Sequence, residues 1–567
     1  MASAHSSSAD RERRRLPRPA LGVPSLTLLA AAFIIGFDNV AFWHELASVS
    51  RVGSSAGLGF AAATAVFLVS ALALLMSVFA FRWMYKPFLM LLLVVAAVVG
   101  YFMQTYGVVI DDTMILNTLD TDTGEAEGLF NFILVWHVVV FGVLPALFVG
   151  WVRIKRAVWW RQALVRVGFG VMLAVVAVGA LASHYKEFSL TLRQHRELRM
   201  YINPTYAIYS AAELAQGQAK AADHRLVTIG PNAHRTAVAH QRSRRKIVIV
   251  VVGETTRAAD WGMDGYHRQT TPQLAALPNL INFPDAHSCG TSTAVSVPCM
   301  FSAKSRAGFD TDSAGYTENL LDVLKRAGVT VRWEENQAGG CKGVCDRVPT
   351  KNMRTMRIPG VCGDGHCMDS VFLHGLADRI NATSGDLVLV MHTMGSHGPS
   401  YFERYPKSFE KYTPTCHSNR PQDCSTQALT NSYDNTVRYV DHVLASLIGV
   451  LKNKESGADT ALVYLSDHGE SLGEDGIYLH GFPYMLAPSQ QTHIPMILWL
   501  SADWRQDDHL SKACLDGINK QRVGQNNLFS TVMGMMGVRA DVYQPKLDLL
   551  ASCRGQGGVA SSASSTH

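Results

Sequence analysis

The hydrophobic positions along the chain divide it into two halves of different character. Before about residue 183, long apolar runs such as LTLLAAAFIIGF and FLMLLLVVAAVVGYF alternate with short polar segments. Five apolar runs are long enough to cross the hydrocarbon core of a bilayer as helices. We therefore predict an N-terminal transmembrane domain of five helices, at residues 23–45, 57–81, 87–109, 129–151 and 163–183.

Lys and Arg in the segments between these runs predict the orientation of the helices. The tail before the first run and the loops after the second and fourth runs carry basic residues, whereas 108–128 contains none. Basic loops stay on the cytoplasmic side, so the N-terminus is expected in the cytoplasm. The first run lacks a small-residue cleavage site and is interpreted as a retained helix. Five crossings place the chain beyond residue 184 outside, which in a bacterium is the periplasm.

The second half of the chain changes to short apolar runs that alternate with amphipathic segments. Residues 317–329 and 429–453 have the spacing of helices that cover a sheet. The β-branched runs are typical of buried parallel strands. They lie at 244–254, 386–398, 460–471 and 494–501. This order predicts an α/β domain with a mostly parallel sheet and helices on both faces.

These patterns predict five consecutive parts of the chain. A cytoplasmic tail at 1–22 precedes the transmembrane domain at 23–183. A polar, partly helical linker at 184–243 leads to the periplasmic domain at 244–553. The low-complexity end, 554–567, is expected to be disordered.

The composition agrees with a membrane protein and argues against a nucleic-acid partner. The 567 residues are 48% hydrophobic and 17% charged, which is apolar for a soluble protein. The formal net charge is +5, and the soluble half is close to neutral. Such a half has no field strong enough to attract nucleic acid.

All ten cysteines lie in the second half, at or after Cys289. An even number in one half suggests disulfides in an oxidising compartment, whereas CKGVC and CGDGHC also have the gaps of zinc fingers. The predicted outer location favours disulfides. Connectivity does not follow from sequence, but proximity and elimination suggest Cys289–Cys299, Cys341–Cys345, Cys362–Cys367, Cys416–Cys424 and Cys514–Cys553.

Acids and histidines follow the predicted strands at the points where the strands end. Glu254 lies at the end of the first strand, His392 and His397 at the end of the second, and Asp467 and His468 at the end of the third, with His480 soon after. Ligands of such sheets bind beyond the carboxyl ends of the strands. Each residue alone has an ordinary structural explanation, but together they predict a metal site. Oxygen and nitrogen donors suit zinc, with manganese as the alternative.

The stretch HSCGTSTAVSVPCM places several hydroxyl side chains, Thr293 among them, between Cys289 and Cys299. The simple interpretation is a Ser/Thr-rich loop closed by a disulfide. The alternative is that one hydroxyl does chemistry and the disulfide holds it still. A bound dication favours the alkoxide form, which can attack phosphorus and form a covalent intermediate.

Four motifs resemble the lipid A phosphoethanolamine transferases, the family that includes the mobile colistin resistance enzymes. The motifs are VVGETTR, SCGTSTAVSVPCMFS, HTMGSHGP and SDHGESLGEDGIYLHG. The resemblance covers nearly the whole chain and implies five membrane spans before an alkaline-phosphatase-like, or sulfatase-like, domain.

The resemblance also implies roles for individual residues. Thr293 corresponds to the nucleophile, and the zinc ligands correspond to Glu254, Thr293, Asp467 and His468. His397 and His480 match histidines near the transferred phosphate or a second zinc. The residues matching those that contact the donor head group are Asn117, Thr121, Glu125 and Lys342.

The function implied is transfer of phosphoethanolamine from phosphatidylethanolamine to a lipid A phosphate. It proceeds through a phosphoethanolamine–threonine intermediate and confers resistance to polymyxins, including colistin. The protein is expected to be a monomer among inner-membrane lipids. One alternative keeps the fold but changes the acceptor to a lipopolysaccharide core sugar or a periplasmic glucan, or the transferred group to phosphoglycerol. Another is a zinc-dependent membrane sensor or scaffold without activity.

Overall fold

The computed structural model separates into two compact units. One consists of Met1–Tyr101 with Phe132–Thr205, and the other of Phe102–Asn131 with Tyr206–His567. The structure describes residues 18–50, 55–81, 83–120, 129–155, 158–222, 224–363, 366–454 and 457–554. Of the two predicted tails, residues 1–17 and 555–567 therefore lie outside the described residues.

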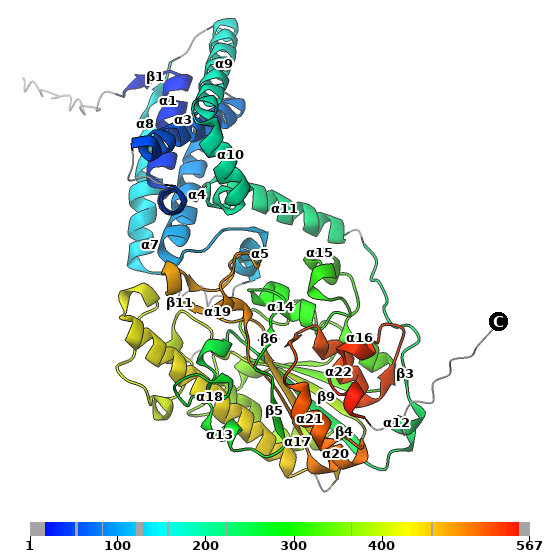
Figure 1. The fold of residues 1–567 in the computed structure, drawn as a ribbon. Helices are drawn as coiled ribbons and strands as arrows, with labels where there is room; N and C mark the ends of the chain where they lie inside the picture. The colour runs from blue at the N-terminus through cyan, green and yellow to red at the C-terminus, as the bar shows by residue number, and fades with distance from the viewer. Residues whose placement is uncertain are drawn as a thin grey trace, which may run out of the picture. The chain divides into compact units, whose positions relative to one another are not determined.

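The first unit contains the apolar helices, and the predicted spans are found with small shifts at their ends (Figure 1). Among the described residues, four helical spans are long and apolar enough to cross a membrane, and one bent pair makes a possible fifth. The unbroken spans are Gly57–Val78 in α3 (Ser55–Val78), α4 (Tyr85–Tyr106), Phe132–Trp151 (α7, η1 and α8 together) and α9 (Trp159–Ser183).

The first predicted span is not one straight helix. It is divided into α1 (Val23–Phe37) and α2 (Val40–Val49), which meet at 60°. The Asn39 side-chain amide donates to the backbone oxygens of Ile34 and Asn203. The Asn203 side chain in turn donates to the carbonyls of Asp38 and Ala96. These buried amides satisfy backbone groups that a break in a helix would leave open.

The second unit is built on a seven-stranded sheet with the order β5-β13-β10-β4-β9-β7-β8. The central strands run parallel, while β13 is antiparallel to β10 and to β5. The strands are β4 (Arg245–Gly253), β5 (Leu280–Asn282), β7 (Thr330–Glu335), β8 (Thr350–Asn352), β9 (Leu387–His392), β10 (Ala458–Ser466) and β13 (Met496–Leu500). The predicted α/β fold is confirmed, although the strands expected to reach 398 and 471 end earlier.

Helices cover both faces of this sheet. Successive side chains of a strand point to opposite faces, so a continuous apolar strand needs a cover on each. In β4, Val248, Val250 and Val252 belong to a core with α16 (Leu320–Arg326) and α22 (Asn527–Met536). Ile247, Ile249 and Val251 belong to a second core with α18 (Thr426–Lys452). Both faces of β4 are buried, as its continuous apolar sequence predicts.

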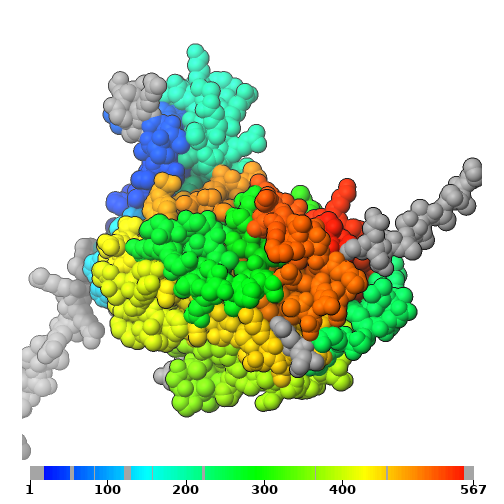
Figure 2. All heavy atoms as spheres, turned by 60° about the horizontal axis from the view of Figure 1, so that its bottom comes forward, coloured from blue at the N-terminus to red at the C-terminus, as the bar shows by residue number. Residues whose placement is uncertain are grey.

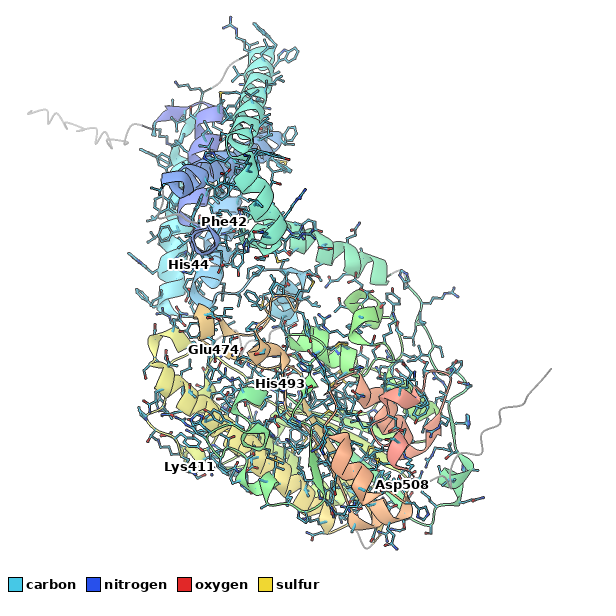
Figure 3. The ribbon with its side chains drawn as sticks, in the orientation of Figure 1. Phe42, His44, Lys411, Glu474, His493 and Asp508 are labelled. Atoms are coloured by element: carbon cyan, nitrogen blue, oxygen red, sulfur yellow. A yellow bond between two sulfur atoms is a disulfide. The ribbon has the colours of Figure 1, made fainter. Side chains whose placement is uncertain are left out.

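The two ends of the sheet carry different kinds of polar group. At the amino end, the buried Lys246 pairs with Asp508 at 2.6 Å, and its ammonium lies 3.9 Å from the centre of the Trp504 ring. Figure 2 shows this side of the unit, which green, yellow and orange segments cover. Glu474, beyond the carboxyl ends, lies at the opposite side from Asp508 (Figure 3). The amino end therefore holds a structural ion pair, and the acid–histidine motifs gather at the carboxyl end.

The turn after β4 is held in an unusual conformation. Thr255 has φ 56°, a left-handed value that is strained for a β-branched residue. The Tyr433 hydroxyl, on α18, donates to the Thr255 carbonyl at 2.7 Å and accepts from the Arg257 amide at 2.9 Å. Gly395 is required nearby, since a Cβ there would lie 2.4 Å from the Glu254 carbonyl oxygen.

We expect Tyr433→Phe to lower the thermal unfolding midpoint of the purified protein by a few degrees. Two buried backbone groups would lose their partner, at a cost of about 1–3 kcal/mol. Tyr412→Phe is the matched control, because its hydroxyl bonds Gln269 at the surface. Equal midpoints for the two variants would contradict a structural role for the Tyr433 hydroxyl.

Candidate metal and nucleophile site

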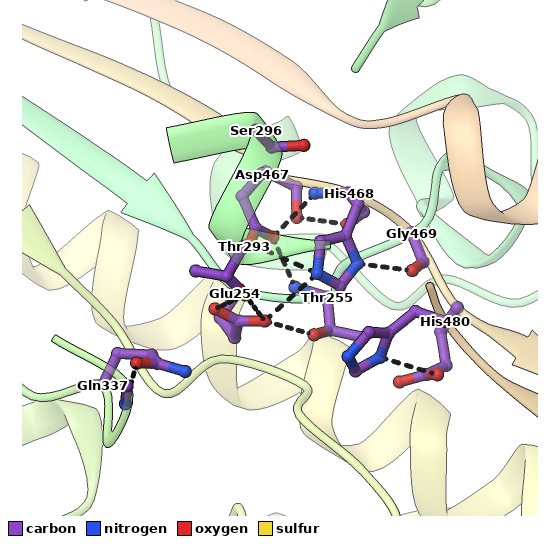
Figure 4. Close-up of polar contacts among 12 residues, drawn as sticks. Glu254, Thr255, Thr293, Ser296, Gln337, Asp467, His468, Gly469 and His480 are labelled. Carbon is purple, nitrogen blue, oxygen red and sulfur yellow. Dashed lines mark hydrogen bonds and ion pairs between the residues drawn. The ribbon is translucent and has the colours of Figure 1, made fainter. Parts of the chain in front are cut away.

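Three buried side chains converge where β4 and β10 end. The two strands pair in parallel with Ser466 opposite Gly253, so the residues that follow, Glu254 and Asp467, lie next to each other. His468 comes directly after (Figure 4). One ligand atom from each of Glu254, Asp467 and His468 lies within 4.8 Å of the others, and all three side chains are fully buried.

The donor atoms of this cluster fit a metal ion. His468 Nδ1 donates to the Gly469 carbonyl at 2.9 Å, which leaves the lone pair of Nε2 facing the acids. Neither His468 Nε2 nor Asp467 Oδ2 has a hydrogen-bond partner in the described chain. Burial, helped by His480, lowers the pKa of His468 to about 3, so its imidazole is neutral at neutral pH, as a ligand must be. Buried polar atoms without partners are rare, and a cation would satisfy both.

Thr293 is the hydroxyl that faces the cluster. It is the first residue of α14 (Thr293–Met300), and its Oγ1 lies 3.3 Å from both carboxylate oxygens of Glu254. Two of the neighbouring hydroxyls bond elsewhere: Thr291 donates to the Phe482 carbonyl, and Ser296 accepts from the Gly290 amide. The N-terminus of α14 also favours negative charge near Thr293.

His397 and His480 stand beside the cluster with opposite proton affinities. Their ring centres are 5.4 Å apart, and the His480 ring is 4.4 Å from that of His468. Burial lowers the pKa of His397 to about 3. Burial also disfavours the charged form of His480, but Glu470 outweighs it and raises the pKa of His480 to about 9. The pair therefore combines a neutral imidazole with a protonated one.

Three residues support the site, His392, Glu335 and Glu470, of which the sequence indicated only His392, as a strand-end histidine without an assigned role. His392 Nδ1 lies 3.0 Å from Glu335, and its Nε2 lies 3.8 Å from Glu254. Glu470 pairs with His480 at 3.3 Å. Burial and Asp467 raise the pKa of Glu254, but attraction to His392 outweighs them and leaves it below the ordinary value. The position of Glu470 within SDHGE was a usable signal, whereas Glu335 had none beyond its place at a strand end.

A buried glutamine joins the loop before Thr293 to the end of β10, where Asp467 and His468 lie. Gln525 is 1% exposed, and its Oε1 accepts from the Cys289 amide at 2.7 Å. Its Nε2 donates to the carbonyls of Ser466 at 2.8 Å and Asp467 at 2.6 Å. One side chain thus fixes the distance between the loop that leads to Thr293 and the end of β10.

All ten cysteines are paired, which leaves none for a zinc finger. Cys341, Cys345 and Asp346 lie close enough together to hold a metal, but the two sulfurs bond each other, so these residues are not a metal site. The pairs coincide with those suggested by proximity: Cys289–Cys299, Cys341–Cys345, Cys362–Cys367, Cys416–Cys424 and Cys514–Cys553.

The residues predicted to contact the donor are only partly described. Asn117 lies on α5 (Asp112–Asp120), which packs against α14. Met114 of α5 lies 3.2 Å from where a Cβ on Gly481 would be. Lys342 is half-buried in the turn after β7 and lines a small cavity with Pro298, Ser302 and Asn319. Thr121 and Glu125 lie outside the described residues.

Two family models match this chain, one over most of the apolar helices and the other over the α/β domain. The model described as phosphoethanolamine transferase EptA/EptB matches residues 68–219. The sulfatase model matches residues 246–538, which include the sheet and the metal cluster.

Individual relatives extend this likeness over almost the whole chain. The chain is 40% identical over 544 residues to phosphoethanolamine transferase EptA of Escherichia coli strain K12, covering 96% of this chain and 99% of that protein. It is 38% identical over 487 residues to phosphatidylethanolamine transferase Mcr-1 of Escherichia coli, covering 84% and 89%. The solved integral membrane lipooligosaccharide phosphoethanolamine transferase A from Neisseria meningitidis superposes with a TM-score of 0.89 at 35% identity, covering 94% of this chain and 100% of that chain. This chain belongs to the phosphoethanolamine transferase family.

Proposed function

We propose that this protein transfers phosphoethanolamine from phosphatidylethanolamine to a phosphate of lipid A. The observation that carries the proposal is the Thr293 hydroxyl, held at a helix N-terminus 3.3 Å from Glu254 and beside a cluster that fits a metal. A nucleophile and an electrostatic stabiliser are the parts that phosphoryl transfer needs. The similarity to EptA and Mcr-1 supports the same conclusion.

Zinc is the proposed cofactor, held by Glu254, Asp467, His468 and Thr293. The donor set of two acids and one imidazole suits zinc. When bound, zinc would lower the pKa of a coordinated hydroxyl and neutralise charge on the phosphoryl oxygens.

The side chains divide the work of the first half-reaction. Thr293 Oγ1 forms a bond to the donor phosphorus and gives up its proton towards the Glu254 carboxylate, which lies within 3.3 Å. The phosphorus–oxygen bond to diacylglycerol breaks, and the protonated His480 supplies the proton that this leaving oxygen needs. His397, neutral and adjacent, is placed to donate a hydrogen bond to the phosphoryl group. The N-terminal amides of α14 favour the negative charge that remains.

In the second half-reaction, an oxygen of the acceptor phosphate attacks the phosphorus and the bond to Thr293 breaks. Glu254 returns its proton to Thr293 Oγ1. The acceptor phosphate, which arrives as a monoanion, gives its proton to His480, so the chain ends as it began. The donor head group needs polar and acidic side chains near its ammonium. In the first half-reaction this head group would be oriented by Asn117, Thr121, Glu125 and Lys342.

The compartment follows from the same features. Five disulfides in the catalytic half agree with a periplasmic location, and the apolar helices with the inner membrane. Addition of ethanolamine places a cation on an anionic lipid, so cationic peptides such as polymyxins would bind it less well.

Thr293→Ala is expected to reduce transfer by a factor on the order of 10³ or more, because the attacking oxygen is lost. The readout is the mass spectrum of lipid A from a polymyxin-sensitive host, with polymyxin survival beside it. Thr293→Ser keeps the hydroxyl and serves as the control. A phosphoethanolamine increment of wild-type intensity at equal expression of Thr293→Ala would refute the nucleophile assignment.

Asp467→Asn and His468→Gln are each expected to weaken zinc binding at least about tenfold, since each removes a donor of the cluster. Zinc per chain is measured on purified protein by elemental analysis after dialysis at several free-zinc concentrations. The control is His442→Gln, which removes a partly exposed imidazole on α18 that packs against Phe409, and it should bind as wild type does. Unchanged affinity in both cluster variants would place the metal elsewhere.

A further inference from the structure

A second polar cavity lies beside the nucleophile loop. Its volume is about 540 Å³, and none of Glu254, Thr293, Asp467 or His468 lines it. Three parts of the second unit form its walls: the end of the loop at 287–289, the segment 521–527 before and at the start of α22, and the segment 545–549. Arg306 and Tyr484 complete the rim. The cavity is therefore distinct from the metal cluster, although both use the same loop.

The charged groups of this cavity are mainly positive. Arg306, Arg522 and Lys546 are exposed on its walls, and none of them has an ion-pair partner in the described part of the chain. Several arginines elsewhere in the unit are paired with acids, as Arg268 is with Asp434 at 2.8 Å. Unpaired cations around a concave surface create a positive field that attracts anions.

The acids near the cavity do not cancel this charge. Asp548 is the one acid on its walls, and its Oδ2 is taken by Arg554 and by the Tyr543 hydroxyl. Asp285 lies outside the walls and pairs with His287 at 2.7 Å. The three unpaired cations therefore remain available to a ligand.

Two further features prepare the cavity for an oxyanion. Arg306 lies 3.3 Å over the ring of Tyr484, whose hydroxyl donates to the Ser288 carbonyl at 2.9 Å. Stacking of this kind holds a guanidinium in place and reduces the entropy lost on binding. Asn526 and Asn527, at the N-terminus of the ten-residue α22, also line the cavity. A helix N-terminus adds partial positive charge there.

One residue connects the wall of the cavity to the end of β10. Gln525 lines the cavity, while its amide binds Cys289 on one side and the carbonyls of Ser466 and Asp467 on the other. An occupant of the cavity would thus lie beside Ser288 and Cys289, in the loop that leads to Thr293, and Gln525 connects this wall to the backbone of Asp467. This place suits a substrate that approaches Thr293 with one phosphate and needs to be held by another.

We propose that this cavity binds a phosphate group of the anionic acceptor lipid, an inference that rests on the proposed function. The ligand chemistry is a phosphate monoester, which arginine and lysine recognise through charge-assisted hydrogen bonds. Phosphatidylethanolamine is zwitterionic and carries a single phosphate, the one that Thr293 attacks, so a cationic cavity away from Thr293 favours the polyanionic acceptor over the donor.

The test is the double variant Arg522→Gln/Lys546→Gln in the full-length protein. Its matched control is Lys351→Gln/Lys411→Gln, which removes two exposed cations outside the cavity. We expect the KM for bisphosphorylated lipid A to rise about tenfold and the kcat at saturating lipid A to stay the same. Release of diacylglycerol from fluorescent phosphatidylethanolamine, which needs no acceptor, should not change. The affinity for fluorescent lipid A in detergent micelles, measured without turnover, should fall by the same factor.

Equal lipid A affinity and equal KM in the variant and its control would overturn the proposal. If wild-type protein binds inorganic phosphate tightly, and the variant loses this binding while it keeps lipid A affinity, the ligand is free phosphate and the acceptor role is wrong. Failure of the proposed function has a different signature, since wild-type protein would then release no diacylglycerol, whereas the micelle binding assay would still report on the cavity.

Discussion

Parallel pairing of β4 with β10 is the constraint on which the chemistry of the second unit depends. In this register Gly253 lies opposite Ser466, so Glu254 and Asp467 leave the sheet side by side. A slip of one residue would turn every side chain of a strand to the other face. Because β4 is apolar on both faces, its hydrophobic side chains alone do not distinguish one register from the next. The polar contacts at its two ends do, since a slip would separate Lys246 from Asp508 and the Thr255 amide from the Asp467 carboxylate, which it now meets at 3.0 Å. These contacts fix the register, and the register fixes the positions of Glu254 and Asp467.

The remaining parts of the site are attached to this strand pair by buried hydrogen bonds to backbone atoms. Gln525 ties the loop before Thr293 to the end of β10, and Tyr433 ties α18 to the turn after Glu254. A buried polar group that loses its partner costs more than an average hydrogen bond contributes. The site is consequently arranged before any ligand arrives, and the strain at Thr255 is held by its surroundings.

Charge is distributed differently in the metal cluster and in the cavity beside it. The cluster buries its acids against imidazoles and fits a cation, whereas the cavity exposes cations that have no carboxylate partner. Under the function and the acceptor site proposed above, these two regions of opposite charge, joined through Gln525, would distinguish a zwitterionic donor from a polyanionic acceptor.

The sequence by itself determined the apolar spans, the α/β class and the acid, histidine and threonine motifs, because these depend on local periodicity and on residues close together in the chain. It did not determine the break at Asp38–Asn39, since the partner of Asn39 is Asn203, which lies far away in the sequence. Nor did it reveal Glu335, Gln525 or the cavity of Arg306, Arg522 and Lys546. Their side chains carry no motif and acquire a role only when distant segments meet. Tertiary structure decided these features because burial and the field of unpaired charges depend on neighbours in space.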